Sequence, residues 1–100
     1  MVAYKGKGIQ NQRRLNPMVQ RIRIYTTELC GDCHRAKAFL KNRNIPYEEI
    51  NIEETPGAAE IVTRANNGKR AVPTLEVDGR FVACSPFRPN ILIKALGLES

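Results

Sequence analysis

The first half of the chain alternates hydrophobic and polar positions in two distinct rhythms. From Val19 to Thr26 the alternation has a period of two, as in a strand with one buried face. The segment from Asp32 to Asn42 has no proline, glycine or β-branched residue, and its apolar positions recur at helical spacing. In residues 47–52, Ile50 and Ile52 again share one face. The pattern predicts a strand, a helix and a second strand that lies beside the first.

The second helix is predicted from its boundary residues. Thr55 is a suitable N-cap, and Pro56 fits the first helical position, where its missing N–H is not needed. The helix should run to about Asn66, because the residues of the NNGK motif tolerate the left-handed backbone that ends helices.

A hairpin and a last helix complete the pattern. The apolar segments 74–77 and 80–83 are separated by Asp78-Gly79, a dipeptide that strongly favours a tight turn between antiparallel strands. The last helix is expected from Pro89 to Leu96, with a glycine directly after its end. The order strand, helix, strand, helix, strand, strand, helix predicts an α/β fold, a four-stranded mixed sheet covered by three helices.

Size and charge divide the chain in two. The 100 residues suffice for one domain with a single core. Residues 1–20 hold four basic residues and no acidic one, whereas residues 21–100 hold twelve basic and ten acidic residues. We therefore distinguish a basic N-terminal extension, residues 1–20, from a folded domain, residues 21–100. No segment resembles a secretory signal or a membrane span, and no nucleic-acid motif accompanies the basic charge. We expect a cytoplasmic protein with neither a membrane nor a nucleic-acid partner.

Cys30 and Cys33 form a CxxC motif at the start of the first predicted helix. A helix N-terminus supplies unpaired N–H groups and partial positive charge, so it favours the thiolate of Cys30 as the attacking group. Cys33 lies one turn further along and can resolve a mixed disulfide formed on Cys30. The acidic residues Glu28 and Asp32 oppose the thiolate, so we expect a site that favours reduction of its substrates. Such a site needs no cofactor beyond a redox-active disulfide between Cys30 and Cys33.

Metal binding is the other chemistry that a CxxC motif can serve. A tetrahedral zinc site needs four ligands, and the sequence adds only His34 and Cys84, so we expect no intramolecular metal site. An iron–sulfur cluster that bridges two chains stays open, because each chain would offer two thiolates. His34 could act as a base, although an exposed polar residue is the simpler interpretation. Cys84 is interpreted as a core residue, or as a regulatory thiol if it lies near the CxxC motif.

Pro73 directly precedes the third predicted strand. Proline cannot donate a hydrogen bond to a sheet, and trans X-Pro bonds are far commoner than cis ones, so the residues alone favour a trans proline at the start of a strand. A cis Val72-Pro73 bond would leave the Val72 backbone free to pair with an extended substrate that carries a disulfide. Val72 and Pro73 are therefore candidate substrate-binding residues.

The order of elements, the CxxC motif and the VP dipeptide together resemble the glutaredoxin-like branch of the thioredoxin superfamily, from Arg21 to Gly97. The stretches CGDCHRAK and SPFRPN are similar to those of the NrdH-type redoxins, and YEEINIEE and NNGKRAVPT are more similar to the mycoredoxins. The first two stretches contain the residues that we regard as supporting the motif, namely Gly31, Asp32, Lys37, Ser85 and Arg88.

The resemblance implies a thioredoxin fold with a cis Pro73 and a monomeric thiol-disulfide oxidoreductase that acts on protein disulfides or mixed disulfides. It implies thioredoxin reductase or a low-molecular-weight thiol as electron donor, and NrdH-type redoxins pass their electrons to ribonucleotide reductase. Three positions depart from the family patterns. Glu28 replaces a lysine ahead of the CxxC motif, Ala83-Cys84 replaces a glycine pair, and Pro86 replaces the glycine of the redoxin signature. The first two departures argue against ordinary use of glutathione.

Overall fold

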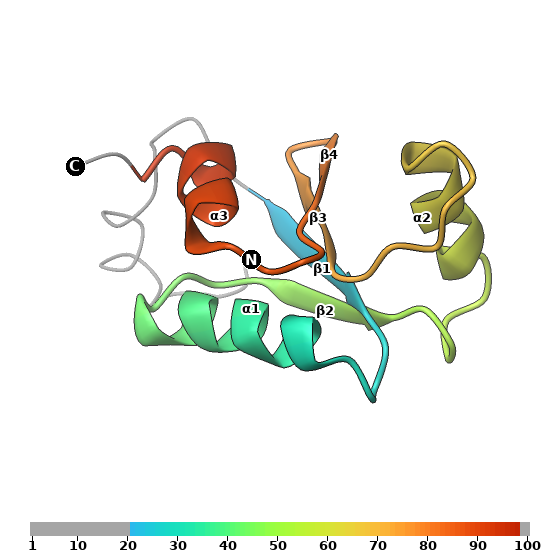
Figure 1. Cartoon of the computed structure of the whole chain (residues 1–100), viewed down its shortest axis with the longest axis horizontal. Coiled ribbons are helices and arrows are strands. Elements are labelled where there is room, and N and C mark those ends of the chain that lie inside the picture. Colours follow the sequence, from blue (N-terminus) through green and yellow to red (C-terminus); the bar gives the residue numbers. More distant parts are fainter. Residues whose placement is uncertain (1–20, 99–100) are drawn as a thin grey trace.

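The computed structural model describes residues 21–98 as four strands and three helices (Figure 1). The predicted N-terminal extension and the predicted strand start at Val19 lie outside the described residues. No helix within residues 21–98 has the length and hydropathy needed to cross a membrane. The elements follow the predicted order: β1 (Ile22–Thr26), α1 (Gly31–Asn42), β2 (Glu48–Asn51), α2 (Ala58–Ala65), β3 (Thr74–Val77), β4 (Arg80–Ala83) and α3 (Pro89–Leu96).

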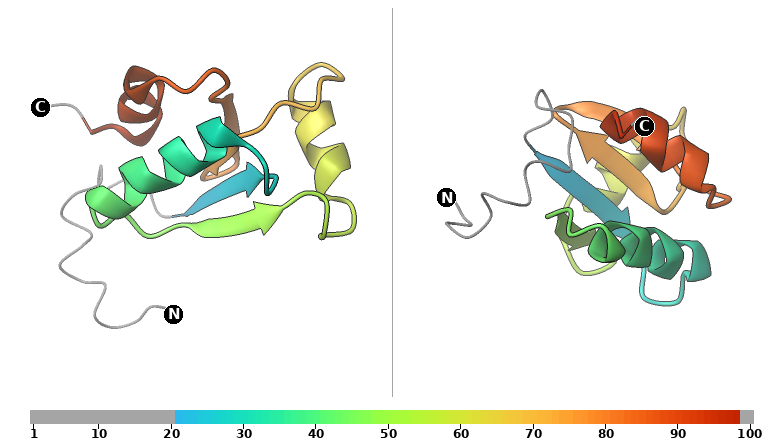
Figure 2. Two further views of the ribbon diagram at one scale, coloured as in Figure 1. Left: turned by 60° about the horizontal axis from the view of Figure 1, so that its bottom comes forward. Right: turned by 90° about the vertical axis from the view of Figure 1, so that its left-hand side faces the viewer.

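The strands form one mixed sheet in the order β2-β1-β3-β4. β1 and β2 are parallel, because α1 carries the chain back along the sheet between them, whereas β3 pairs in antiparallel fashion with both β1 and β4. α1 and α3 contact each other, while α2 lies apart from them (Figures 1 and 2). The predicted α/β fold, with a mixed four-stranded sheet and three helices, is confirmed.

β1 presents alternate residues to two separate hydrophobic clusters, as its period of two predicts. Ile22 and Ile24 belong to the larger cluster, which joins the sheet to α1 and α3. Tyr25 belongs to the smaller cluster, which joins the sheet to α2. Fully buried members of the larger cluster include Ala36 and Leu40 of α1, Leu75 and Val77 of β3, and Leu92 and Leu96 of α3. This packing fixes α1 against the sheet, and four residues separate the end of β1 from the start of α1.

The start of α2 differs from the sequence prediction. The helix begins at Ala58 rather than Pro56, and its N-cap is Gly57 rather than Thr55. Gly57 has a φ of +83°, a left-handed conformation that glycine adopts without steric cost. The Thr55 N–H donates to the Asn51 carbonyl at 3.0 Å, and the Thr55 carbonyl accepts a hydrogen bond from the Ala58 N–H at 3.1 Å. Thr55 and Pro56 therefore belong to the turn before the helix, and the predicted cap is wrong.

The turn between β3 and β4 forms as its dipeptide predicts. Asp78 and Gly79 both have positive φ, 51° and 90°, the combination found in type I′ hairpin turns. The Asp78 carboxylate accepts a hydrogen bond from the Arg21 N–H at 2.7 Å, which ties the start of β1 to this hairpin. α3 also has the predicted bounds, with Pro89 in its first turn and Gly97 as its C-cap.

Candidate active site

The two cysteines of the CxxC motif lie together at the N-terminus of α1. Cys30 is the N-cap residue and has an extended backbone, with φ −107° and ψ 111°. Its Sγ accepts a hydrogen bond from the Cys33 N–H at 3.0 Å, so the sulfur takes the place of a capping side chain. Both cysteines are free thiols, Cys30 partly exposed and Cys33 buried. The geometry therefore gives one accessible sulfur and one enclosed sulfur one helical turn away.

Burial sets the acid–base behaviour of Cys33. Desolvation, followed by the hydrogen bond and the charge of the neighbouring Cys30, raises the pKa of the Cys33 thiol to about 12, while a backbone hydrogen bond from Thr27 and the charge of Lys37 act in the opposite direction. Cys33 is thus a protonated thiol at neutral pH. Cys30, at the helix N-terminus and open to solvent, is the sulfur that an external disulfide can reach.

Lys37 belongs to a polar network that joins α1 to the strands β1 and β2. It follows Cys33 by four residues on α1, so both side chains lie along one face of the helix. Its side chain is 18% exposed, and its Nζ donates to Glu49 Oε2 at 2.9 Å. The Thr26 hydroxyl donates to the same Oε2 at 2.9 Å. The bond to Lys37 lowers the pKa of Glu49, so the pair is ionised at neutral pH and a fixed positive charge acts on Cys33.

Glu49 and Thr26 were not singled out from the sequence. The alternation of β2 places Glu49 and Ile50 on different faces of the sheet. Which of these faces carries α1 follows only from the parallel pairing of β1 with β2, and Glu49 lies on the α1 side. The spacing of Lys37 from Cys33 was the available local signal, because four residues make one turn of a helix.

The Val72 carbonyl lies beside the sulfur of Cys30. The Val72-Pro73 peptide bond is cis, as the resemblance implied, and Ser85-Pro86 is a second cis bond that was not anticipated. The Cys30 thiol donates to the Val72 carbonyl at 3.7 Å. Pro73 is buried, and its carbonyl accepts from the Cys84 N–H at 2.9 Å, which extends the pairing of the β3–β4 hairpin. The Val72 backbone is therefore held against the exposed sulfur.

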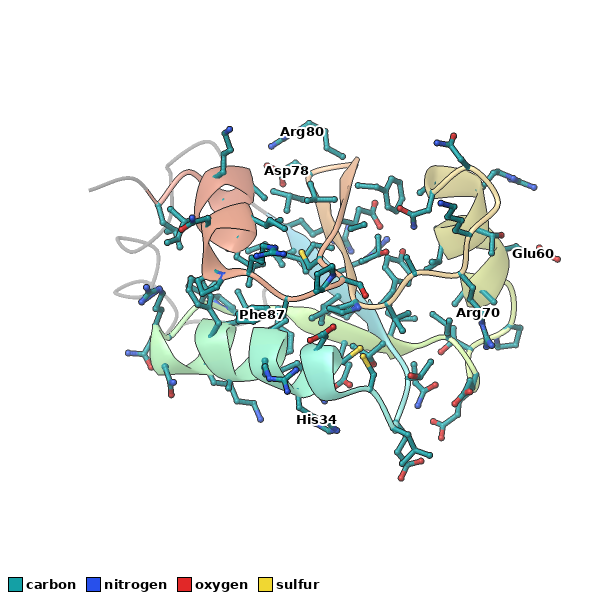
Figure 3. The ribbon with its side chains drawn as sticks, in the orientation of Figure 1. His34, Glu60, Arg70, Asp78, Arg80 and Phe87 are labelled. Atoms are coloured by element: carbon teal, nitrogen blue, oxygen red, sulfur yellow. The ribbon has the colours of Figure 1, made fainter. Side chains whose placement is uncertain are left out.

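The loop before Cys30 and the first turn of α1 are held by short polar contacts. The Arg35 guanidinium donates to the Asp32 carboxylate at 2.7 Å, so the charge of Asp32 is balanced by its neighbour on the helix. His34 lies on the outer surface of α1, directed away from the sheet (Figure 3), and its Nε2 is 3.2 Å from the Glu28 carbonyl. This placement favours a polar surface residue over a catalytic base for His34.

The remaining predicted residues have different surroundings. Gly31 is the first residue of α1 and is exposed. Ser85 and Arg88 are exposed on the connection from β4 to α3, and no hydrogen bond or ion pair among residues 21–98 joins either of them to the cysteines. Cys84 is fully buried in the larger cluster, and burial raises the pKa of its thiol to about 11. Its surroundings match the core interpretation rather than a regulatory thiol.

No group of three or more His, Cys, Asp and Glu side chains within residues 21–98 is arranged to hold a metal ion.

Comparison with known proteins agrees with this geometry. The glutaredoxin family model matches residues 22–82. A Mycobacterium tuberculosis H37Rv protein described as a glutaredoxin is 47% identical over 53 residues, which cover 53% of this chain and 63% of that protein's own length. The glutaredoxin-like protein NrdH of Escherichia coli K12 is 38% identical over 72 residues, 72% of this chain and 84% of that protein.

A solved structure supports the same assignment. The crystal structure of a thioredoxin-like protein superposes with a TM-score of 0.65 at 30% sequence identity, covering 76% of this chain and all of that chain. The shared fold, the matched family model and the CxxC motif at the start of α1 place this chain in the glutaredoxin family.

Proposed function

We propose that this protein is a thiol-disulfide oxidoreductase in which Cys30 attacks the substrate disulfide and Cys33 resolves the intermediate. The observation that carries this proposal is the contact between the Cys33 N–H and the Cys30 Sγ at 3.0 Å at the N-terminus of α1. Unpaired N–H groups at a helix N-terminus stabilise a thiolate, which is the nucleophile in disulfide exchange.

The first step transfers a bond between sulfur atoms. The Cys30 thiolate attacks one sulfur of the substrate disulfide, a Cys30–substrate disulfide forms, and the other substrate sulfur leaves as a thiolate that takes a proton from water. The cis Val72-Pro73 segment supports an extended substrate here, because the Val72 carbonyl lies 3.7 Å from Cys30 Sγ.

The second step depends on the state of Cys30. Once Cys30 is part of a mixed disulfide it carries no negative charge, so its charge no longer raises the pKa of Cys33. Lys37 continues to favour the Cys33 thiolate. Cys33 loses its proton, attacks Cys30 Sγ and releases the second substrate thiolate, leaving a Cys30–Cys33 disulfide. The substrate has gained two electrons from the protein; its two new thiols take their protons from water, which also receives the protons released by Cys30 and Cys33.

An electron donor must restore the two thiols, and two classes fit the chain. The relationship to NrdH and the SPFRPN stretch favour thioredoxin reductase as donor and ribonucleotide reductase as one protein target. A low-molecular-weight thiol, two molecules of which would be oxidised to their disulfide, is the other class. Electrons pass through sulfur atoms alone, so the proposed cycle uses no bound cofactor.

The proposal is tested by following the three thiols through a single oxidation. Pre-reduced protein is mixed with bis(2-hydroxyethyl) disulfide, the remaining thiols are alkylated under denaturing conditions, and the peptides are mapped by mass spectrometry. We expect the peptide map to show Cys30 and Cys33 joined in one disulfide and Cys84 in its alkylated form. A disulfide that includes Cys84, or oxidation of Cys30 without Cys33, would contradict the assignment.

The donor is tested by coupled turnover. NADPH oxidation is followed with thioredoxin reductase in one series and with glutathione and glutathione reductase in another, with the same disulfide substrate. We expect turnover with thioredoxin reductase, because Glu28 and Ala83-Cys84 replace the residues typical of glutathione-dependent members. Turnover with glutathione alone would reverse the choice of donor.

The charge of Lys37 should be visible in the pH dependence of the second step. Replacing Lys37 by glutamine removes a positive charge that lowers the pKa of Cys33, so the pKa rises and resolution requires a higher pH. We expect the midpoint of the rate of mixed-disulfide resolution to move to higher pH. Rapid chemical quenching across a pH series measures this rate.

Lys41→Gln is the matched control for this experiment. It removes the same charge from the same helix, and Lys41 acts on Glu49 but is not one of the main causes of the Cys33 shift. An equal displacement of the midpoint in both variants would assign the effect to net charge and contradict a specific role for Lys37.

A further inference from the structure

Leu29 is the most exposed large hydrophobic residue among residues 21–98. Its exposed fraction is 96%, compared with 42% for Ile61 and 38% for Phe81. Single exposed hydrophobic residues are common on protein surfaces, but this one directly precedes the partly exposed Cys30. Its position beside the attacking sulfur distinguishes it from the other two.

The loop that carries Leu29 is held on both sides. On one side the Glu28 carbonyl contacts His34 Nε2 at 3.2 Å. On the other side the Cys30 carbonyl accepts from the His34 N–H at 3.2 Å, and the Cys30 Sγ accepts from the Cys33 N–H. Leu29 therefore extends into solvent from a segment whose two neighbouring residues are both bound to α1.

We propose that Leu29 is a specificity-determining contact for protein substrates, on which an apolar side chain next to the substrate disulfide packs. This inference rests on the proposed function, because it takes Cys30 as the sulfur that binds the substrate. Leu29 is the chain neighbour of Cys30 and its side chain is exposed, so a protein substrate bonded to Cys30 Sγ can place one of its own side chains over it. Covering a leucine side chain is favourable in proportion to the apolar area removed from water.

The same geometry predicts selectivity between substrate classes. A protein disulfide brings flanking side chains, some of them apolar, to both sides of the bond. A small polar disulfide reaches Cys30 but has no apolar group to place over Leu29. Leu29 should therefore accelerate the first step with proteins and leave the reaction with small polar disulfides unchanged.

The test compares single-turnover rate constants for two disulfides. Pre-reduced protein, freed of its reductant, is mixed with insulin or with bis(2-hydroxyethyl) disulfide, and the loss of the Cys30 and Cys33 thiols is followed by quenching, alkylation and mass spectrometry. For Leu29→Ser we expect a rate constant about tenfold lower with insulin, equivalent to about 1.4 kcal/mol. With bis(2-hydroxyethyl) disulfide the variant and the unmodified protein should agree within about twofold, and Leu29→Met should keep most of the rate with insulin.

Ile61→Ser and Phe81→Ser are matched controls, because each removes an exposed hydrophobic side chain from another part of the surface. Both should react with insulin at the unmodified rate. The inference is overturned if Leu29→Ser keeps the full rate with insulin, or if it loses the same factor with both disulfides. Failure of the proposed function is a different result, in which Cys30→Ser still reduces bis(2-hydroxyethyl) disulfide.

Discussion

Replacement of Cys30 by serine is expected to abolish disulfide reduction, lowering its rate by at least about 1000-fold. A serine hydroxyl remains protonated at neutral pH and cannot form the mixed disulfide, although it can still accept the Cys33 N–H as an N-cap. The fold should therefore persist while the chemistry is lost. Turnover with bis(2-hydroxyethyl) disulfide measures the loss, and circular dichroism during heating checks the fold.

Cys84→Ala is the control for this result. It also removes one of the three cysteine sulfurs, but from the buried cluster rather than from the helix N-terminus. We expect it to reduce the disulfide at close to the unmodified rate while lowering thermal stability slightly. If Cys30→Ser retained a substantial fraction of the activity, another group would have to be the nucleophile.

Replacement of Cys33 by serine should stop the cycle one step later. The first attack needs only Cys30, so a mixed disulfide with the substrate forms, but no neighbouring thiolate is present to break it. We expect the trapped species to accumulate stoichiometrically and its intramolecular resolution to fall by about 1000-fold or more. Intact-mass spectrometry detects the added substrate thiol.

The trapped species has a clear identity test. Dithiothreitol should release the substrate thiol and restore the starting mass of the Cys33→Ser variant. In the unmodified protein the same adduct should be transient and should give way to a form two mass units lighter than the reduced chain. Release from Cys33→Ser at the unmodified rate would show that Cys33 is not the resolving group.

The fold was predictable where local residues decide it. The alternation of β1 and the turn residues Asp78-Gly79 are local signals, and the structure has the strand and the turn that they predict. The start of α2 was missed because Thr55 and Pro56 form a plausible helix start on their own. In the structure the chain makes a further turn at Gly57 before α2 begins, and no pattern in the sequence indicated the left-handed conformation of this glycine.

In the candidate site, too, contacts within one element were predictable from the sequence, whereas contacts between separate elements were not. Cys30 and Cys33 are neighbours on one helix turn, so their spacing alone predicts their contact. The pair of Lys37 with Glu49 joins α1 to β2, and no local pattern predicts which residues of two separate elements meet. The exposure of Leu29 was also unpredictable, since a leucine in a sequence normally indicates burial.

Because Cys84 is buried, the rate at which its thiol reacts with an alkylating reagent reports the stability of the fold. Its side chain is fully enclosed, whereas Cys30 is open to solvent, so the two thiols meet an alkylating reagent in different states of the chain. Cys30 is labelled in the native protein, but Cys84 is labelled only when the cluster opens. The rate of Cys84 labelling in the native protein, divided by the rate in the unfolded chain, therefore gives the equilibrium constant of that opening, and from it the free energy of opening under native conditions.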